Sequence, residues 1–217
     1  MFKKFMLIVS SATLVAGCGA QKDKPSQTPT STQETVDFGS SKDNKTIEFT
    51  IVDANGVDVS VYKPDFSEYY YLDESSDYVK GITFNEALKF FGSDFTGLVF
   101  YGYPTCAFCN EAFPVAVELS NQMQQPLYYV NVHMEGYGPD EISLNEFEKV
   151  AYAWYQDDGE GGKSFFVPTL FAIVNGEIVD AHTGLLSGVS IDTTQPLSQE
   201  HHDMLASEYQ RLFDTVK

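Results

Sequence analysis

Two cysteines separated by two residues are the part of this chain best suited to chemistry. Cys106 and Cys109 lie in the stretch YGYPTCAFCNEAFP, residues 101–114, where an apolar run typical of a strand gives way to a helical pattern. Such a pair can be a redox couple, half of a metal site or a structural disulfide. The residues around the pair and the elements that carry it distinguish these three.

The expected position of Cys106 favours redox chemistry. At the start of a helix, its sulfur meets unpaired backbone N–H groups and the positive end of the helix dipole, which stabilise a thiolate. Such surroundings lower the pKa of a cysteine into a range of about 3.5 to 7.5. Cys109 follows one helical turn later on the same face. We therefore expect Cys106 to be the nucleophile of disulfide exchange and Cys109 to resolve the mixed disulfide.

A metal site and an inert bridge are the two rivals. A structural zinc ion needs four ligands, and the four histidines of the chain show no ligand spacing with the cysteines: His133, His182, His201 and His202. We expect neither a metal nor a bound cofactor. A structural bridge is the stronger rival, because exported domains carry disulfides. The loop that this pair would close is very short, however, so its entropic effect on the unfolded chain would be small.

The third cysteine, Cys18, has a separate explanation at the N-terminus. Lys3 and Lys4 precede a short apolar run that ends in small residues, which is the layout of a secretory signal. The run is short for a permanent membrane span. Residues 14–18, LVAGC, resemble the bacterial lipobox, and this resemblance implies cleavage before Cys18 and lipid on its sulfur. The prediction is a signal peptide at 1–17; the alternative is an ordinary signal peptide with an incidental cysteine.

A lipid anchor would place the protein on the extracytoplasmic face of a bacterial cell membrane, where disulfides persist. Residues 18–45 are rich in Ser, Thr, Gln, Lys and Pro and lack apolar periodicity, which predicts a disordered tether. Residues 46–217 have the size of one domain. The net charge of −18 becomes −20 when the two lysines of the signal are removed, and this argues against nucleic acid as a partner.

Strands and helices alternate along the domain. The predicted strands occupy residues 46–53, 57–62, 97–103, 127–134, 169–174 and 177–182. Asn55-Gly56 and Asn175-Gly176 are suited to the tight turns of hairpins between neighbouring strands.

Helical patterns fill the intervals between these strands. The predicted helices occupy residues 84–91, 107–124 and 143–156, and a last helix carries Leu205, Tyr209, Leu212 and Val216 on one face. Thr83 and Glu86 predict a capping box before the first of them. The alternation predicts an α/β fold of three layers, a mixed central sheet with helices on both faces.

The domain resembles thioredoxin-fold proteins. CAFC follows the central predicted strand, and Pro114 lies five residues after Cys109, where the active-site helix of that family has a proline. Residues 166–184, FVPTLFAIVNGEIVDAHTG, resemble the cis-proline segment of the family, its hairpin and the following glycine.

This resemblance implies a thioredoxin-like fold in which Pro168 is cis and packs against the cysteine pair. It also implies a substrate groove shaped by Val167, Pro168 and Thr169, in which backbone groups bind an extended substrate segment through strand-like hydrogen bonds.

The sequence departs from the family at several places. Thioredoxins usually carry a buried aspartate six residues before the first cysteine, where this chain has Phe100. Glu111 and Glu135 could supply a carboxylate, but we expect both to be surface acids. Three stretches are predicted insertions around the substrate rim: 135–142, 157–162 and 185–197.

The predicted function is a membrane-tethered, extracytoplasmic thiol-disulfide oxidoreductase that acts on cysteine-containing exported proteins or peptides. A redox partner, expected in the membrane, would reset the pair. YGYPTCAFC also resembles the bacteriocin transport accessory proteins of Gram-positive bacteria, which would imply exported peptides as substrates. The alternative is a non-catalytic lipoprotein binding or accessory module on the same scaffold, with a structural disulfide. The direction of exchange stays open, because it depends on the reduction potential of the pair.

Overall fold

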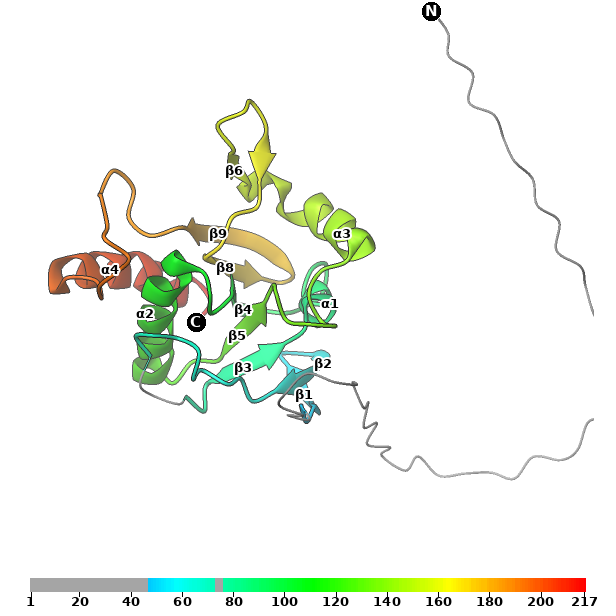
Figure 1. The fold of residues 1–217 in the computed structure, drawn as a ribbon. Coiled ribbons are helices and arrows are strands. Elements are labelled where there is room, and N and C mark those ends of the chain that lie inside the picture. The colour runs from blue at the N-terminus through cyan, green and yellow to red at the C-terminus, as the bar shows by residue number, and fades with distance from the viewer. Residues whose placement is uncertain (1–46, 73–75) are drawn as a thin grey trace, which may run out of the picture. The chain divides into compact units, whose positions relative to one another are not determined.

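A computed structural model describes residues 47–72 and 76–217 (Figure 1). The predicted signal peptide at 1–17, the predicted lipidation site Cys18 and the predicted tether at 18–45 lie outside the described residues. Within the described ranges, no helix is long and apolar enough to cross a membrane.

A mixed sheet of seven strands forms the centre of the domain, in the order β1-β2-β3-β5-β4-β8-β9. Its strands are β1 (Thr50–Ala54), β2 (Val57–Tyr62), β3 (Val79–Ile82), β4 (Gly97–Gly102), β5 (Leu127–Asn131), β8 (Thr169–Val174) and β9 (Glu177–Thr183). Strands β3, β5 and β4 are parallel. Strand β8 is antiparallel to β4, and hairpins β8–β9 and β1–β2 form the two edges.

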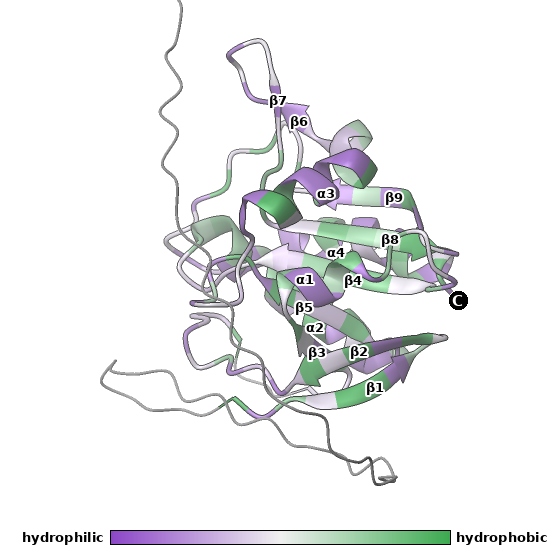
Figure 2. Cartoon of the chain, turned by 90° about the vertical axis from the view of Figure 1, so that its right-hand side faces the viewer, coloured by the Kyte–Doolittle hydropathy of each residue, from purple (hydrophilic) through white to green (hydrophobic). Residues whose placement is uncertain are grey.

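Helices cover both faces of this sheet. They are α1 (Phe84–Leu88), α2 (Ala107–Met123), α3 (Glu141–Ala151) with the 3-10 turn η1 (Tyr152–Trp154), and α4 (Gln199–Thr215). Figure 2 shows α1 and α3 in front of the sheet and α2 and α4 behind it. A small hairpin of β6 (Gln156–Asp157) and β7 (Lys163–Ser164) follows η1. The predicted three-layer α/β fold is confirmed.

Side chains of the central strands alternate between two apolar cores. Leu98 and Phe100 of β4 belong to the core under α2 and α4, whereas Val99 and Tyr101 belong to the core under α1 and α3. Because both faces of β4 are buried, its sequence is a continuous apolar run instead of an alternating one.

Several predicted elements are confirmed with close to the expected bounds. Helix α2 starts directly after Cys106 and ends before Gln124, whose φ of 53° places it in the left-handed region typical of a C-cap. Strand β8 has the predicted bounds, and both Asn-Gly pairs form hairpin turns. Helix α4 buries three of the four apolar residues predicted for one face, Leu205, Tyr209 and Leu212, and the fourth, Val216, is buried directly after the helix ends.

The predicted capping box of α1 is only half present. Thr83 Oγ1 accepts the N–H of Glu86 at 3.1 Å, as expected. The carboxylate of Glu86 instead accepts the N–H of Ser60 in β2 at 2.7 Å, so it ties α1 to the sheet. A complete capping box lies at α3, between Asp140 and Ser143, and this box starts the helix two residues before the predicted position.

Candidate active site

Cys106 lies at the junction of β4 and α2. It is the N-cap residue of α2, and its Sγ accepts the backbone N–H of Cys109 at 3.2 Å. Both cysteines are free thiols. Cys106 is 9% exposed and Cys109 is fully buried, so the outer sulfur is the one that a reaction partner can reach.

The surroundings of Cys106 lower its pKa from the ordinary 9.0 to about 7. The largest cause is a hydrogen bond from the thiol of Cys109, followed in the same direction by the backbone N–H groups of Cys109 and Phe108. Burial opposes them, because it disfavours the charged form. The lowered pKa agrees in direction with the prediction, but the second thiol contributes more to it than the backbone N–H groups at the helix start.

The pKa of Cys109 is shifted in the opposite direction. Burial raises its pKa well above the ordinary value, and the hydrogen bond to Cys106 and the charge there raise it further. Gly102 of β4 makes room for this thiol, since a Cβ added at that glycine would lie 3.2 Å from Cys109 Sγ. Cys106 is thus the more readily ionised of the two sulfurs.

The proline segment lies beside this pair. The peptide bond between Val167 and Pro168 is cis, as the resemblance implies, and Cys106 Sγ is 4.0 Å from the carbonyl oxygen of Val167. Thr169 is 1% exposed, and its Oγ1 donates to the carbonyl of Phe166 at 2.7 Å and pairs with Thr183 Oγ1 at 2.9 Å. The Thr169 side chain therefore supports the proline segment from within the fold.

Cys109 belongs to an apolar core that is rich in aromatic side chains. Phe100 is fully buried and packs against Phe113, with ring centroids 4.9 Å apart. The hydroxyls of Tyr69 and Tyr129 are 3.0 Å apart, and burial raises the pKa of both tyrosines well above the ordinary value. Phe100 thus fills the position of the usual aspartate as part of an apolar cluster.

Glu111 is not the surface acid that the sequence predicts. It is only 3% exposed, because the stretch 185–197 covers the first turns of α2. Its Oε2 accepts the N–H of Leu197 at 2.9 Å, whereas Oε1 has no hydrogen-bond partner within the described part of the chain. Burial raises the pKa of this carboxyl. Glu135 is exposed, as expected.

Asn110 is a site residue that the sequence reasoning missed. It directly follows Cys109, is 2% exposed and hydrogen-bonds the turn that carries Cys106. Its sequence signal is weak, because Asn110 is one of two successive polar residues, with Glu111, that follow the cysteine pair. Also beside the turn, the rings of Tyr103 and His133 stack with centroids 3.8 Å apart.

The predicted insertions lie at different places in the fold. Residues 157–162 span the turn of the β6–β7 hairpin, and residues 135–142 lead into α3. Within residues 47–72 and 76–217, no group of three or more His, Cys, Asp or Glu side chains is arranged to hold a metal ion.

Comparison with known proteins gives distant structural likenesses. Neither a family model nor a curated protein matches the chain. The crystal structure of thioredoxin from Aeropyrum pernix is 17% identical, with a TM-score of 0.34, over 60% of this chain and 84% of that one. Thioredoxin O2 from Arabidopsis thaliana, in the oxidised state, is 20% identical, with a TM-score of 0.37, over 63% of this chain and 95% of that one. The parallel strands β3, β5 and β4, the antiparallel β8–β9 hairpin and the helices on both faces give the chain a thioredoxin-like fold.

Proposed function

We propose that the protein is a thiol-disulfide oxidoreductase that acts on cysteine-containing proteins or peptides through Cys106 and Cys109. The observation that carries this proposal is the unequal state of the two sulfurs. Cys106 is a helix N-cap with a pKa of about 7, and Cys109 beneath it is a buried thiol with a raised pKa. A structural bridge needs no such difference, whereas stepwise disulfide exchange needs one thiolate that attacks first.

In the reducing direction, the Cys106 thiolate attacks one sulfur of a substrate disulfide. The substrate S–S bond breaks, its other sulfur leaves as a thiolate that takes a proton from solvent, and a mixed disulfide forms on Cys106. Cys109 then loses its proton and attacks Cys106, which releases the second substrate thiolate. The substrate gains two electrons and the cysteine pair loses two; oxidation is the reverse sequence.

The mixed disulfide itself favours the second step. Part of the raised pKa of Cys109 comes from the charge on Cys106 and from the hydrogen bond between the two sulfurs. When Cys106 becomes part of a disulfide, it is neutral, so this contribution disappears. Cys109 then gives up its proton more easily at the stage at which it must attack.

Val167, Pro168 and Thr169 complete the proposal as the substrate-binding segment. The main chain of Val167 lies close to Cys106 Sγ, which supports binding of an extended substrate segment at this place. Thr169 would act indirectly, because its hydroxyl is bonded to Phe166 and Thr183.

Location and partners belong to the same proposal. The signal-like N-terminus and the lipobox support lipidation at Cys18 and tethering to the extracytoplasmic face of a bacterial membrane. Turnover requires a redox partner, proposed in the membrane, and exported proteins or peptides as substrates, in a role like that of bacteriocin transport accessory proteins. Labelling of the wild-type chain with a fatty acid, and its loss in Cys18→Ala, would test the anchor.

The proposed chemistry can be tested by accumulating the mixed disulfide in a variant that cannot resolve it. Full-length Cys109→Ala should accumulate disulfide-linked substrates on Cys106 that a reductant releases, because the resolving thiol is gone. Cys106→Ala is the matched control and should trap none. If folded Cys109→Ala traps no more than this control, the non-catalytic module is the better description. The reduction potential of the wild-type pair then gives the direction, since about 30 mV corresponds to a tenfold change in the equilibrium constant.

A further inference from the structure

The side chain of Asn110 connects the turn that carries Cys106 to a distant segment of the chain. Its Nδ2 donates to the carbonyl oxygens of Pro104 and of Cys106, the latter at 3.1 Å. Its Oδ1 accepts the backbone N–H of Tyr70 at 2.7 Å. The buried amide thus makes three hydrogen bonds, two through its nitrogen and one through its oxygen.

The partners fix the orientation of this amide and require its chemical type. Two carbonyl acceptors face Nδ2, and one N–H donor faces Oδ1, so the group cannot be flipped without losing all three bonds. A carboxylate would set an oxygen against the two carbonyls. An apolar side chain would leave buried polar groups unpaired.

One of the two carbonyls belongs to Cys106 itself, and the other belongs to Pro104, two residues before it. The carbonyl of Cys106 also accepts the N–H of Asn110 at 3.0 Å, which is the first hydrogen bond of α2. Cys106 Sγ accepts the N–H of Cys109 only while Cys106 keeps the extended N-cap conformation, with φ of −82° and ψ of 118°. A side chain that holds these carbonyls therefore also holds the sulfur at the helix start.

The segment on the other side of the amide is firmly anchored. The ring of Phe66 packs against that of Phe113, with centroids 5.3 Å apart, and the hydroxyl of Tyr69 pairs with that of Tyr129. The backbone of Tyr70 directly follows these anchors, while its side chain is 79% exposed. Asn110 thus ties the turn to a fixed part of the core.

We propose that Asn110 is a positioning residue, which holds Cys106 in its N-cap geometry by tying the cysteine turn to the anchored Phe66–Tyr70 segment. The purpose of this positioning rests on the proposed function. The effect of the positioning on the pKa of the Cys106 thiol can be measured without any substrate.

The test is the titration of Cys106 in full-length Asn110→Ala. Alkylation by iodoacetamide is followed against pH through the mass of the peptide that contains Cys106. Loss of the ties should raise the pKa of Cys106 by about half a unit to one unit, the equivalent of about one hydrogen bond. The alkylation rate at pH 7 should then fall about two- to fivefold.

Asn110→Ser supplies a rescue variant. A serine in a helix can donate to the carbonyl four residues earlier, which here is the carbonyl of Cys106. This variant should therefore keep one of the three ties, and its pKa shift should lie between those of the wild type and Asn110→Ala.

Asn121 supplies the matched control. It lies further along α2, and its Oδ1 accepts the hydroxyl of Ser76 at 2.5 Å, so it also ties the β2–β3 connection to the helix, but away from Cys106. Asn121→Ala should lower the urea midpoint and leave the titration of Cys106 unchanged. A wild-type titration in folded Asn110→Ala would overturn the proposal. A shifted titration without any disulfide exchange would support the positioning and contradict the proposed function instead.

Discussion

At the scale of single residues, the reactivity of Cys106 depends on its neighbour. The thiol of Cys109 is the largest cause of the lowered Cys106 pKa, ahead of the backbone N–H groups. Cys109→Ala removes that donor, so the pKa of Cys106 should rise from about 7 toward the ordinary 9.0. Thiolate absorbance near 240 nm against pH measures it.

The matched variant, Cys106→Ala, separates the two sulfurs. Burial remains as the main cause of the raised Cys109 pKa, so this variant should show no thiol titration in the neutral range. If the titration of Cys106 is the same in the wild type and in Cys109→Ala, the backbone N–H groups and not the second thiol stabilise the thiolate.

Glu111 gives a prediction on stability. Burial raises the pKa of this carboxyl in the folded chain above its ordinary 4.5. Folding therefore favours the protonated form, and the associated stability is present below the unfolded pKa and is lost as the pH rises through the folded pKa. Glu111→Gln cannot ionise and keeps an oxygen for the N–H of Leu197. The free energy of unfolding of Glu111→Gln, compared with that of the wild type at the same pH, should therefore be more favourable at pH 7 than at pH 4.

Urea unfolding at the two pH values measures this difference. Glu146→Gln, at an exposed position of α3, is the control and should follow the wild type more closely. An equal pH dependence of both variants would show that Glu111 is ionised without cost in the folded chain.

At the scale of elements, the two Asn-Gly hairpins look alike in sequence but differ in their surroundings. Gly56 and Gly176 have φ of 90° and 76°. A Cβ at Gly56 would meet no atom within 4 Å, whereas one at Gly176 would lie 2.4 Å from the backbone N and O of Ser93. Gly56→Ala should cost about 1 to 2 kcal/mol, for the positive φ alone. Gly176→Ala should cost about 1 to 3 kcal/mol more, because the β8–β9 turn must move away from the α1–β4 connection.

Urea unfolding of the two variants measures both costs. Equal costs would show that the turn at Gly176 can shift freely, although its backbone N–H and C=O are bonded to Phe95 and Gly92, each at 2.9 Å.

The elements that local chemistry determines were predicted from the sequence. A continuous apolar run marks β4, helical spacing marks α2 and α4, and the Asn-Gly pairs mark the hairpins. The position of the cysteine pair at a strand-to-helix junction was predicted from the order of these elements, whereas the cis bond at Pro168 was implied by the motif resemblance alone.

Elements that exist only through distant contacts were missed. Strand β3, VKGI, contains a lysine and a glycine and is a strand because β2 and β5 pair with its two edges. Glu111 and Asn110 are buried by irregular segments, 185–197 and the β2–β3 connection, whose positions no local pattern indicates. The predicted surface position of Glu111 was wrong for this reason.

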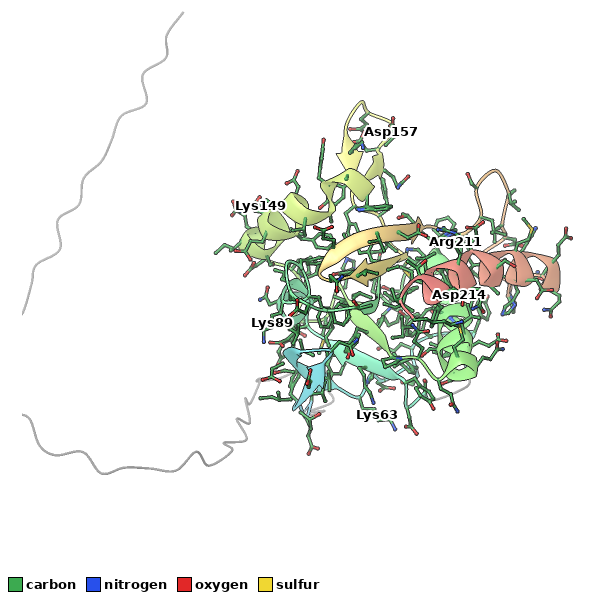
Figure 3. All side chains as sticks on the ribbon, turned by 180° about the vertical axis from the view of Figure 1, so that it is seen from behind. Lys63, Lys89, Lys149, Asp157, Arg211 and Asp214 are labelled. Atoms are coloured by element: carbon green, nitrogen blue, oxygen red, sulfur yellow. The ribbon has the colours of Figure 1, made fainter. Side chains whose placement is uncertain are left out.

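At the scale of the whole molecule, charge determines which substrates approach readily. The net charge of the chain is −18, and Figure 3 shows labelled charged side chains such as Lys89, Lys149 and Asp157 on the outside of the fold. A negative protein attracts cationic partners and repels anionic ones, which changes association rates more than the stability of the complex.

We therefore expect kcat/KM for exchange with a disulfide peptide flanked by lysines to exceed that for the same peptide flanked by glutamates by about tenfold at low salt. An uncharged peptide should lie between them. The ratio should fall as the Debye length shortens from about 30 Å at 0.01 M to about 8 Å at 0.15 M ionic strength, because exposed charges are then screened. Stopped-flow kinetics at the two ionic strengths measures it. A ratio that does not change with salt would mean that direct contacts in the groove, and not the field of the whole molecule, select the substrate.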